Sequence, residues 1–168
     1  MNESIGITSG VPAAYPEAAL DRFRDLVLQG GEVDGAVLAA NIANARLLAT
    51  LTVGSTIRGI AALKRPQGSY RAKLETKADV KLGVDAYPYE LGYVFLEAAL
   101  HGRGLSHQLL AEVLAIEEVA GIFATVRVDN APMRAGLHRA GFVETGRVYA
   151  GRDDREISLL VRRGDKTG

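Results

Sequence analysis

The stretch Glu90–Leu110, ELGYVFLEAALHGRGLSHQLL, decides the fold of this chain. Its first seven residues, ELGYVFL, predict a strand. Gly102 and Gly104 then mark a turn, and from Leu105 the apolar residues recur at helical spacing, which predicts a helix to about Val119. A strand, a glycine turn and a helix in this order are typical of an α/β unit.

Upstream of this stretch the sequence predicts two helices followed by a hairpin. The region 64–87 is the least regular part, and its composition favours a helix between two glycines. The expected elements are a strand at Ser4–Thr8, a helix from Pro16 to Gly30, an alanine-rich helix at Asp34–Asn44, strands at Leu47–Val53 and Thr56–Leu63 around Gly54-Ser55, and a helix within Tyr70–Val80.

Downstream the pattern alternates again. It predicts a buried strand at Ile122–Val128, a helix from Pro132 to Ala140, and a final strand pair at Phe142–Ala150 and Glu156–Val161. An antiparallel meander thus leads into a strand–helix–strand unit. The fold class we expect is mixed α/β (α+β), in one domain over residues 1–168 with a candidate insertion at 64–87.

Composition excludes several classes of function. The 168 residues hold 20 Lys+Arg, 20 Asp+Glu and no Cys. Without cysteine there is no disulfide framework, thiolate zinc site or cysteine nucleophile, and a reducing, cytoplasmic setting fits. Because the net charge is zero, we expect neither nucleic acid nor a membrane surface as a partner, and any anion site must be local.

No targeting or membrane-spanning segment is expected. The start Met1–Ser4 lacks the basic residues and apolar core of a secretory signal. The most apolar stretch, Ala36–Val53, contains Asn41, Asn44 and Arg46, which a bilayer would leave unsatisfied.

The glycine turn is a candidate phosphate site. A turn from a strand into a helix exposes backbone amides at the helix N-terminus, where the helix dipole also favours an anion. Arg103 could add a cation and Ser106 a hydroxyl donor. The alternative is that Gly102 and Gly104 only make a tight turn. A dinucleotide fingerprint is excluded because His107 stands at its third glycine, and no P-loop pattern is present.

The same residues resemble the signature of the GNAT superfamily of acyl-CoA-dependent N-acyltransferases, whose loop reads Arg/Gln-x-x-Gly-x-Gly/Ala. The match is partial, with His101 at the first position, Gly104 at the glycine and Ser106 at the last. A second stretch, Val126–Asn130 followed by Ala140-Gly141-Phe142, is similar to the family's strand, asparagine, helix and Gly-Phe unit. The resemblance covers nearly the whole chain, and residues 62–71 are more loosely similar to a bacterial subgroup.

The resemblance implies a fold and a coenzyme. It implies a mostly antiparallel central sheet flanked by helices and splayed between the Glu90 strand and the Ile122 strand, with acetyl-CoA as co-substrate. Backbone amides of the loop would hold the pyrophosphate, strand amides near Leu96 would face the thioester, and Asn130 would help to position the coenzyme. The coenzyme-binding residues implied are Leu96, His101, Gly102, Arg103, Gly104, Leu105, Ser106 and Asn130.

For catalysis the candidate general base is Glu90, eleven residues before His101. Its alternative is a solvated carboxylate at a strand end. Relatives carry a tyrosine as general acid at the position held here by Leu137. The candidate substitutes are His138, which would point about 100° away on the helix, and the phenols of Tyr149 and Tyr93, for each of which the alternative is a packing role with the hydroxyl at the surface. Water or the proton of the departing amine is a further alternative.

We therefore expect an N-acetyltransferase that moves an acyl group from acyl-CoA to a primary amine by direct attack in a ternary complex. The alternative is a catalytically silent acyl-CoA-binding sensor or partner-binding module. The acceptor would be a small-molecule or peptide amine, and a homodimer is compatible with the exposed edge strands. The three histidines lack the spacing of a metal site, so no metal is expected.

Overall fold

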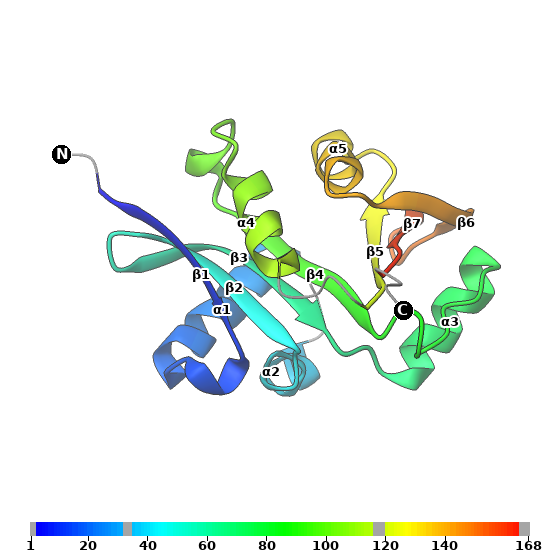
Figure 1. Cartoon of the computed structure of the whole chain (residues 1–168), viewed down its shortest axis with the longest axis horizontal. Coiled ribbons are helices and arrows are strands. Elements are labelled where there is room, and N and C mark those ends of the chain that lie inside the picture. Colours follow the sequence, from blue (N-terminus) through cyan, green and yellow to red (C-terminus); the bar gives the residue numbers. More distant parts are fainter. Residues whose placement is uncertain (1–2, 32–34, 116–119, 165–168) are drawn as a thin grey trace. The chain divides into compact units, whose positions relative to one another are not determined.

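The computed structural model describes residues 3–31, 35–115 and 120–164 (Figure 1). The strands are β1 (Ile5–Gly10), β2 (Leu47–Val53), β3 (Thr56–Lys64), β4 (Tyr89–Leu96), β5 (Ile122–Arg127), β6 (Val143–Ala150) and β7 (Glu156–Arg162). The helices are α1 (Glu17–Gln29), α2 (Gly35–Ala43), α3 (Gly68–Ala78), α4 (Leu105–Leu114) and α5 (Ala131–Arg139), with short 3-10 turns η1 (Pro12–Ala14) and η2 (Ala98–Leu100).

Most predicted elements are confirmed with small shifts at their ends. The β2–β3 hairpin forms, and Gly54 takes a φ of 62° in its turn. The region 64–87 contains α3, which ends at Asp79 in a left-handed conformation. The helix predicted to reach Val119 ends at Leu114, while residues 116–119 and the predicted start of the second helix at Asp34 lie outside the described residues.

The seven strands follow the hydrogen-bonded order β1-β2-β3-β4-β5-β7-β6. The described pairings are antiparallel apart from β4–β5, which is parallel and has only two residue pairs, Tyr89 with Ile122 and Glu90 with Phe123. Both strands are longer than that, at eight and six residues. The predicted fold class, a mostly antiparallel mixed sheet with flanking helices, is confirmed.

The chain divides into two compact units, each built from separate segments. Unit 1 consists of Met1–Arg65 and Leu91–Ile116, and unit 2 of Pro66–Glu90 and Glu117–Gly168. Each unit therefore needs residues that are far apart in the sequence. The boundary at Glu90 falls where the pairing of β4 with β5 ends.

In unit 1 the strands are covered on both faces, with α1 and α2 on one side and α4 on the other (Figure 1). Apolar side chains of α1 and α2 form a core with Leu48, Ile60 and Tyr93. On the opposite face Gly59 lies close to Leu96, since a Cβ there would come within 2.8 Å of that side chain. None of the described helices has the length and apolar character needed to cross a membrane.

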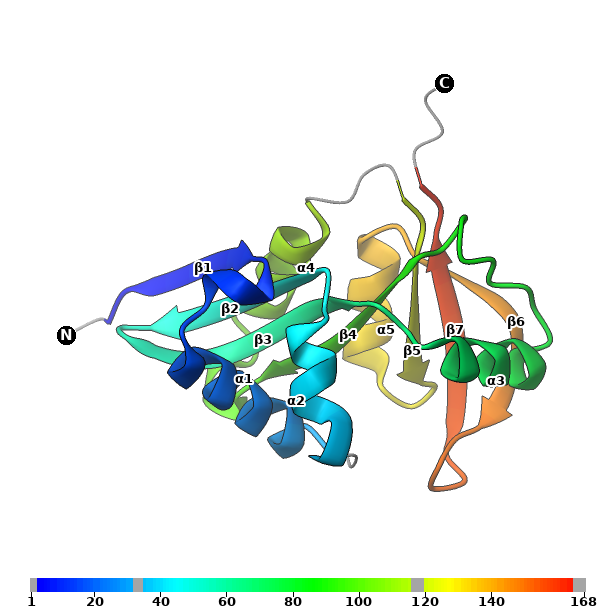
Figure 2. The same cartoon turned by 90° about the horizontal axis from the view of Figure 1, so that it is seen from below.

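In unit 2 the core lies between α3 and the strands β5, β7 and β6. Figure 2 shows β7 and β6 passing behind that helix. Leu74 and Ala78 of α3 pack on Phe123, Leu159 and Val161. These three strand residues are on one face, because Phe123 pairs with Val161 and alternate residues of a strand share a face.

Candidate functional site

The glycine turn of unit 1 has the geometry of an anion cradle. Gly102 and Gly104 adopt φ angles of 80° and 73°, which favour glycine, and apart from its chain neighbours no described residue comes within 4 Å of a Cβ built on either. No side chain caps Gly104, and the first intrahelical bond of α4 runs from the Gln108 N–H to its carbonyl at 3.3 Å. The N–H groups of residues 105–107 therefore lie in a first turn that provides them with no acceptor.

The predicted loop residues divide into an exposed surface and a buried anchor. Arg103 and Ser106 are exposed, whereas the side chain of Leu105 is buried and leaves only its backbone at the surface. His101 turns back toward the strand, and its Nε2 donates a hydrogen bond of 2.7 Å to the Leu96 carbonyl. His101 therefore anchors the loop to the end of β4.

Glu97, which follows β4, is a second anchor. Its Oε1 accepts a hydrogen bond from Arg22 and its Oε2 one from Arg58, both at 2.8 Å. The bond from Arg58 is the largest cause that lowers the pKa of Glu97, and the charge of Arg22 adds to it against burial. The turn that leads to the glycines is thus held to α1 and β3.

Between these anchors and Glu90, β4 contains a backbone irregularity. Tyr93 has a φ of 53°, which is unusual for a residue with a Cβ. Its ring is buried, packs edge-on against Phe23 at 6.4 Å, and lies under the Lys64 ammonium at 4.4 Å. Packing therefore maintains a local strain of the kind that is concentrated at functional sites.

Glu90 lies in unit 2 and is a buried carboxylate with 3% relative exposure, so the solvated alternative is wrong. It pairs with Phe123 and so lies on the face covered by α3. There the Tyr70 hydroxyl donates a hydrogen bond of 2.8 Å to Glu90 Oε2. Burial is costly for a charged carboxylate, and a donor to it offsets part of that cost.

Tyr149 lies on the same face of unit 2. It pairs with Ile157 and packs at the edge of the core under α3. Burial, followed by the charge of Glu90, raises the pKa of Tyr149 to about 12. The structure therefore brings two of the predicted catalytic residues, Glu90 and Tyr149, within electrostatic range of each other and adds Tyr70.

His138 contacts the face of the unit 2 strands that is opposite to α3. Its Nε2 lies 2.8 Å from Oε1 of Glu144, which pairs with Leu160 and so faces away from α3. Burial would raise the pKa of Glu144, but hydrogen bonds from its own backbone and from His138 and Arg134 lower it. The structure does not bring His138 to Glu90, and the neighbouring Leu137 is fully buried, as the turn of the helix requires.

Asn130 is the N-cap of α5. Its Oδ1 accepts a hydrogen bond of 3.2 Å from the Met133 N–H, so this side chain begins the helix. A coenzyme-positioning role for Asn130 stays a prediction.

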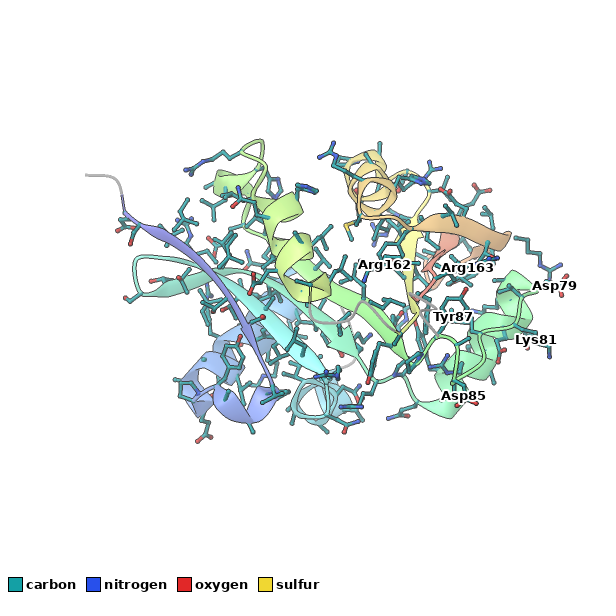
Figure 3. All side chains as sticks on the ribbon, in the orientation of Figure 1. Asp79, Lys81, Asp85, Tyr87, Arg162 and Arg163 are labelled. Carbon is teal, nitrogen blue, oxygen red and sulfur yellow. The ribbon has the colours of Figure 1, made fainter. Side chains whose placement is uncertain are left out.

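A hollow of about 650 Å³ also lies in unit 2; Asp85, Tyr87 and Arg163 of its lining are labelled in Figure 3. Asp85, Tyr87 and Arg163 line it with polar groups, and Gly121 lies where any Cβ would collide with the Ala86 carbonyl. None of the predicted site residues lines this hollow. Among the described residues no group of three or more His, Asp or Glu side chains could hold a metal ion.

Sequence reasoning missed Tyr70 as a partner of Glu90. The two residues are twenty apart and lie in different elements, so no local spacing connects them. The looser resemblance of residues 62–71 to a bacterial subgroup includes Tyr70 but implies no role for its phenol.

No protein-family model matches this chain, and no curated protein matches it. Solved structures do. An acyl-CoA N-acyltransferase from Pseudomonas aeruginosa superposes with a TM-score of 0.68 at 17% identity, covering 95% of this chain and 99% of the other. The structure of yncA from Salmonella typhimurium, solved with its cofactor acetyl-CoA, superposes with a TM-score of 0.63 at 16% identity, covering 98% of this chain and 96% of the other.

A GNAT-family acetyltransferase from Bacillus cereus gives a TM-score of 0.64 at 14% identity, over 97% of this chain and 99% of its own. Such identities carry information about the fold only. The chain has the fold of the GNAT acyltransferases, as the resemblance of its loop and strand signatures predicted.

Proposed function

We propose that this protein is an acyl-CoA-dependent N-acyltransferase that acetylates a primary amine. The observation that carries the proposal is the open glycine turn at the N-terminus of α4 in a chain with the GNAT fold. One structural neighbour is solved with acetyl-CoA. The turn suits the same coenzyme, because its free amides and uncapped helix end are complementary to a pyrophosphate.

The coenzyme would be bound by the turn before α4 and by the side chains beside it. The amides of residues 104–107 would bind the pyrophosphate, with Arg103 and Ser106 exposed beside them. His101 and Glu97 would keep the turn in place through their contacts with the Leu96 carbonyl, Arg22 and Arg58. Since the net charge is zero, this local arrangement would have to supply the attraction for the coenzyme.

The acyl transfer needs two proton movements. The coenzyme, when bound, supplies an acetyl thioester. Glu90 would accept a proton from the acceptor ammonium, directly or through water, so that the neutral amine attacks the carbonyl carbon. As the C–N bond forms and the C–S bond breaks, the nitrogen loses its second proton, which balances the proton given to the departing thiolate. Tyr149 is the candidate donor to the departing thiolate, because a pKa of about 12 keeps its phenol protonated at neutral pH.

The test is release of free thiol from acetyl-CoA with a panel of small-molecule and peptide amines. We expect turnover with at least one amine, and a fall in kcat of about 100-fold for Glu90→Gln, the size typical of a lost general base. Glu156→Gln, at an exposed position, is the matched control and should keep the wild-type rate.

Two outcomes contradict the proposal. Coenzyme binding without amine-dependent thiol release would favour the alternative, a silent acyl-CoA sensor. An unchanged rate in Glu90→Gln would remove this carboxylate from the mechanism.

A further inference from the structure

We propose that Tyr70 is a positioning residue for the Glu90 carboxylate during acyl transfer. The inference rests on the proposed function and adds a residue that neither the sequence motifs nor the structural neighbours assign. Its basis is the 2.8 Å hydrogen bond from the Tyr70 hydroxyl to Glu90 Oε2.

The direction of this bond follows from the chemistry of both groups. An ionised carboxylate only accepts hydrogen bonds, so the phenol donates. Burial and the charge of Glu90 raise the pKa of Tyr70, although a hydrogen bond with Thr125 acts the other way. The phenol therefore stays protonated at neutral pH and limits the rotation of the carboxylate.

The helix that carries Tyr70 is held independently of this bond. The next residue, Arg71, is buried, and its Nη1 donates to the carbonyls of Leu82 and Tyr87, both at 2.8 Å. One turn later Glu75 accepts a hydrogen bond of 2.8 Å from the Leu82 N–H. These contacts tie α3 to the loop that leads into β4, so the hydroxyl is presented from a fixed support.

The two partners differ in solvent exposure, and a conservative substitution of the more exposed one tests positioning apart from packing. Tyr70 is 37% exposed, whereas Glu90 is 3% exposed. A phenylalanine at residue 70 keeps the ring and its packing and removes only the oxygen that contacts the carboxylate. The same change also removes the hydrogen bond with Thr125, so the Glu90→Gln background is needed to show which part of the effect acts through Glu90.

The experiment compares Tyr70→Phe with Tyr87→Phe in the full chain, using acetyl-CoA and the amine that supports turnover. Tyr87 is a half-buried tyrosine of the same unit and serves as the matched control. We expect kcat to fall about tenfold in Tyr70→Phe, as for one lost hydrogen bond to a charged group, with KM for acetyl-CoA within about twofold. Tyr87→Phe should keep the wild-type kcat.

A double-mutant cycle identifies the route of the effect. In a Glu90→Gln background, Tyr70→Phe should lower kcat no further, because the carboxylate through which it acts is gone. An additional tenfold loss in that background would overturn the positioning role. So would a loss of kcat that merely follows a loss of folded protein, measured by circular dichroism.

The failure of this inference differs from the failure of the proposed function. If the wild-type chain turns over and Tyr70→Phe matches its kcat, the role of Tyr70 is overturned and the acyltransferase proposal stands. If the wild-type chain releases no thiol with any amine, the proposed function is overturned, and the role of Tyr70 in it as well.

Discussion

Glu97 holds the turn after β4 through two arginines, and its ionisation makes that support dependent on pH. The carboxylate is partly buried, with 21% of its side chain exposed, and it bonds Arg22 and Arg58 at once. Paired geometry of this kind contributes more than an isolated surface ion pair, which typically adds less than about 1 kcal/mol. The charge of this single residue, Glu97, thus helps to keep the loop before α4 in position.

We predict that Glu97→Gln lowers the free energy of unfolding by about 1 kcal/mol at pH 7. The folded-state pKa of Glu97 is lowered, so its stabilisation is complete above the unfolded value of about 4.3 and is lost as the pH falls through the folded value. The difference between variant and wild type should therefore shrink below about pH 4, as measured by urea unfolding across pH. Glu156→Gln, which is exposed, is the control and should show no such pH trend; a difference independent of pH would contradict the ion-pair account.

At the scale of elements, α3 is a helix with only a weak apolar periodicity in its sequence. Leu74 and Ala78 are its main apolar core contacts, while the buried Arg71 and the half-buried Glu75 bond to the following loop. Composition and two flanking glycines were enough to place a helix in this region. They could not show that its first turn would carry a phenol to a carboxylate.

The turn at the start of α4 can be tested by substituting Gly104. Gly104→Ala places a Cβ in the turn at a φ of 73°, where space is open, so the strain should lower stability by about 1 kcal/mol. We predict in addition that Kd for acetyl-CoA, measured by calorimetry, rises about tenfold, because the methyl group would obstruct the anion. Gly31→Ala is the matched control, since Gly31 also has positive φ and open space, yet lies after α1. Equal affinities of the two variants would mean that the turn does not bind the coenzyme.

At the scale of the whole molecule, long-range pairing sets the order of the strands. The final strand pair is confirmed, but β7 lies between β5 and β6, so the last strand of the chain is internal and β6 is at the edge. Edge position explains why β6 is largely exposed whereas β7 is largely buried. Hairpin periodicity alone does not distinguish these two orders.

Ligand binding should stabilise the chain by mass action. At 100 times Kd, acetyl-CoA should add about 2.7 kcal/mol, which for a chain of this length raises Tm by about 5–10 °C. Differential scanning fluorimetry measures this directly. Pantetheine, which lacks the phosphates, should raise Tm less at equal concentration, and Gly104→Ala should reduce the shift with acetyl-CoA. The absence of any shift at millimolar acetyl-CoA would argue against coenzyme binding.

The sequence by itself determined the elements and the glycine turn. Apolar periodicity and turn residues act over a few positions, so they identify the β2–β3 hairpin, α1, and the passage from β4 through Gly104 into α4. The absence of cysteine also excluded disulfides and cysteine chemistry without any structure. The family resemblance added the mostly antiparallel order of the sheet, in which β4 and β5 form the parallel pair.

Only the tertiary structure decided which polar groups meet. Tyr70 reaches Glu90 because α3 packs over the strands of unit 2, and His138 contacts Glu144, whose pairing with Leu160 puts it on the other face of these strands. The positive φ of Tyr93 likewise depends on Phe23 and Lys64 from other elements. Each of these features rests on contacts between residues that are distant in the chain or on different elements. Local propensity carries no information about them.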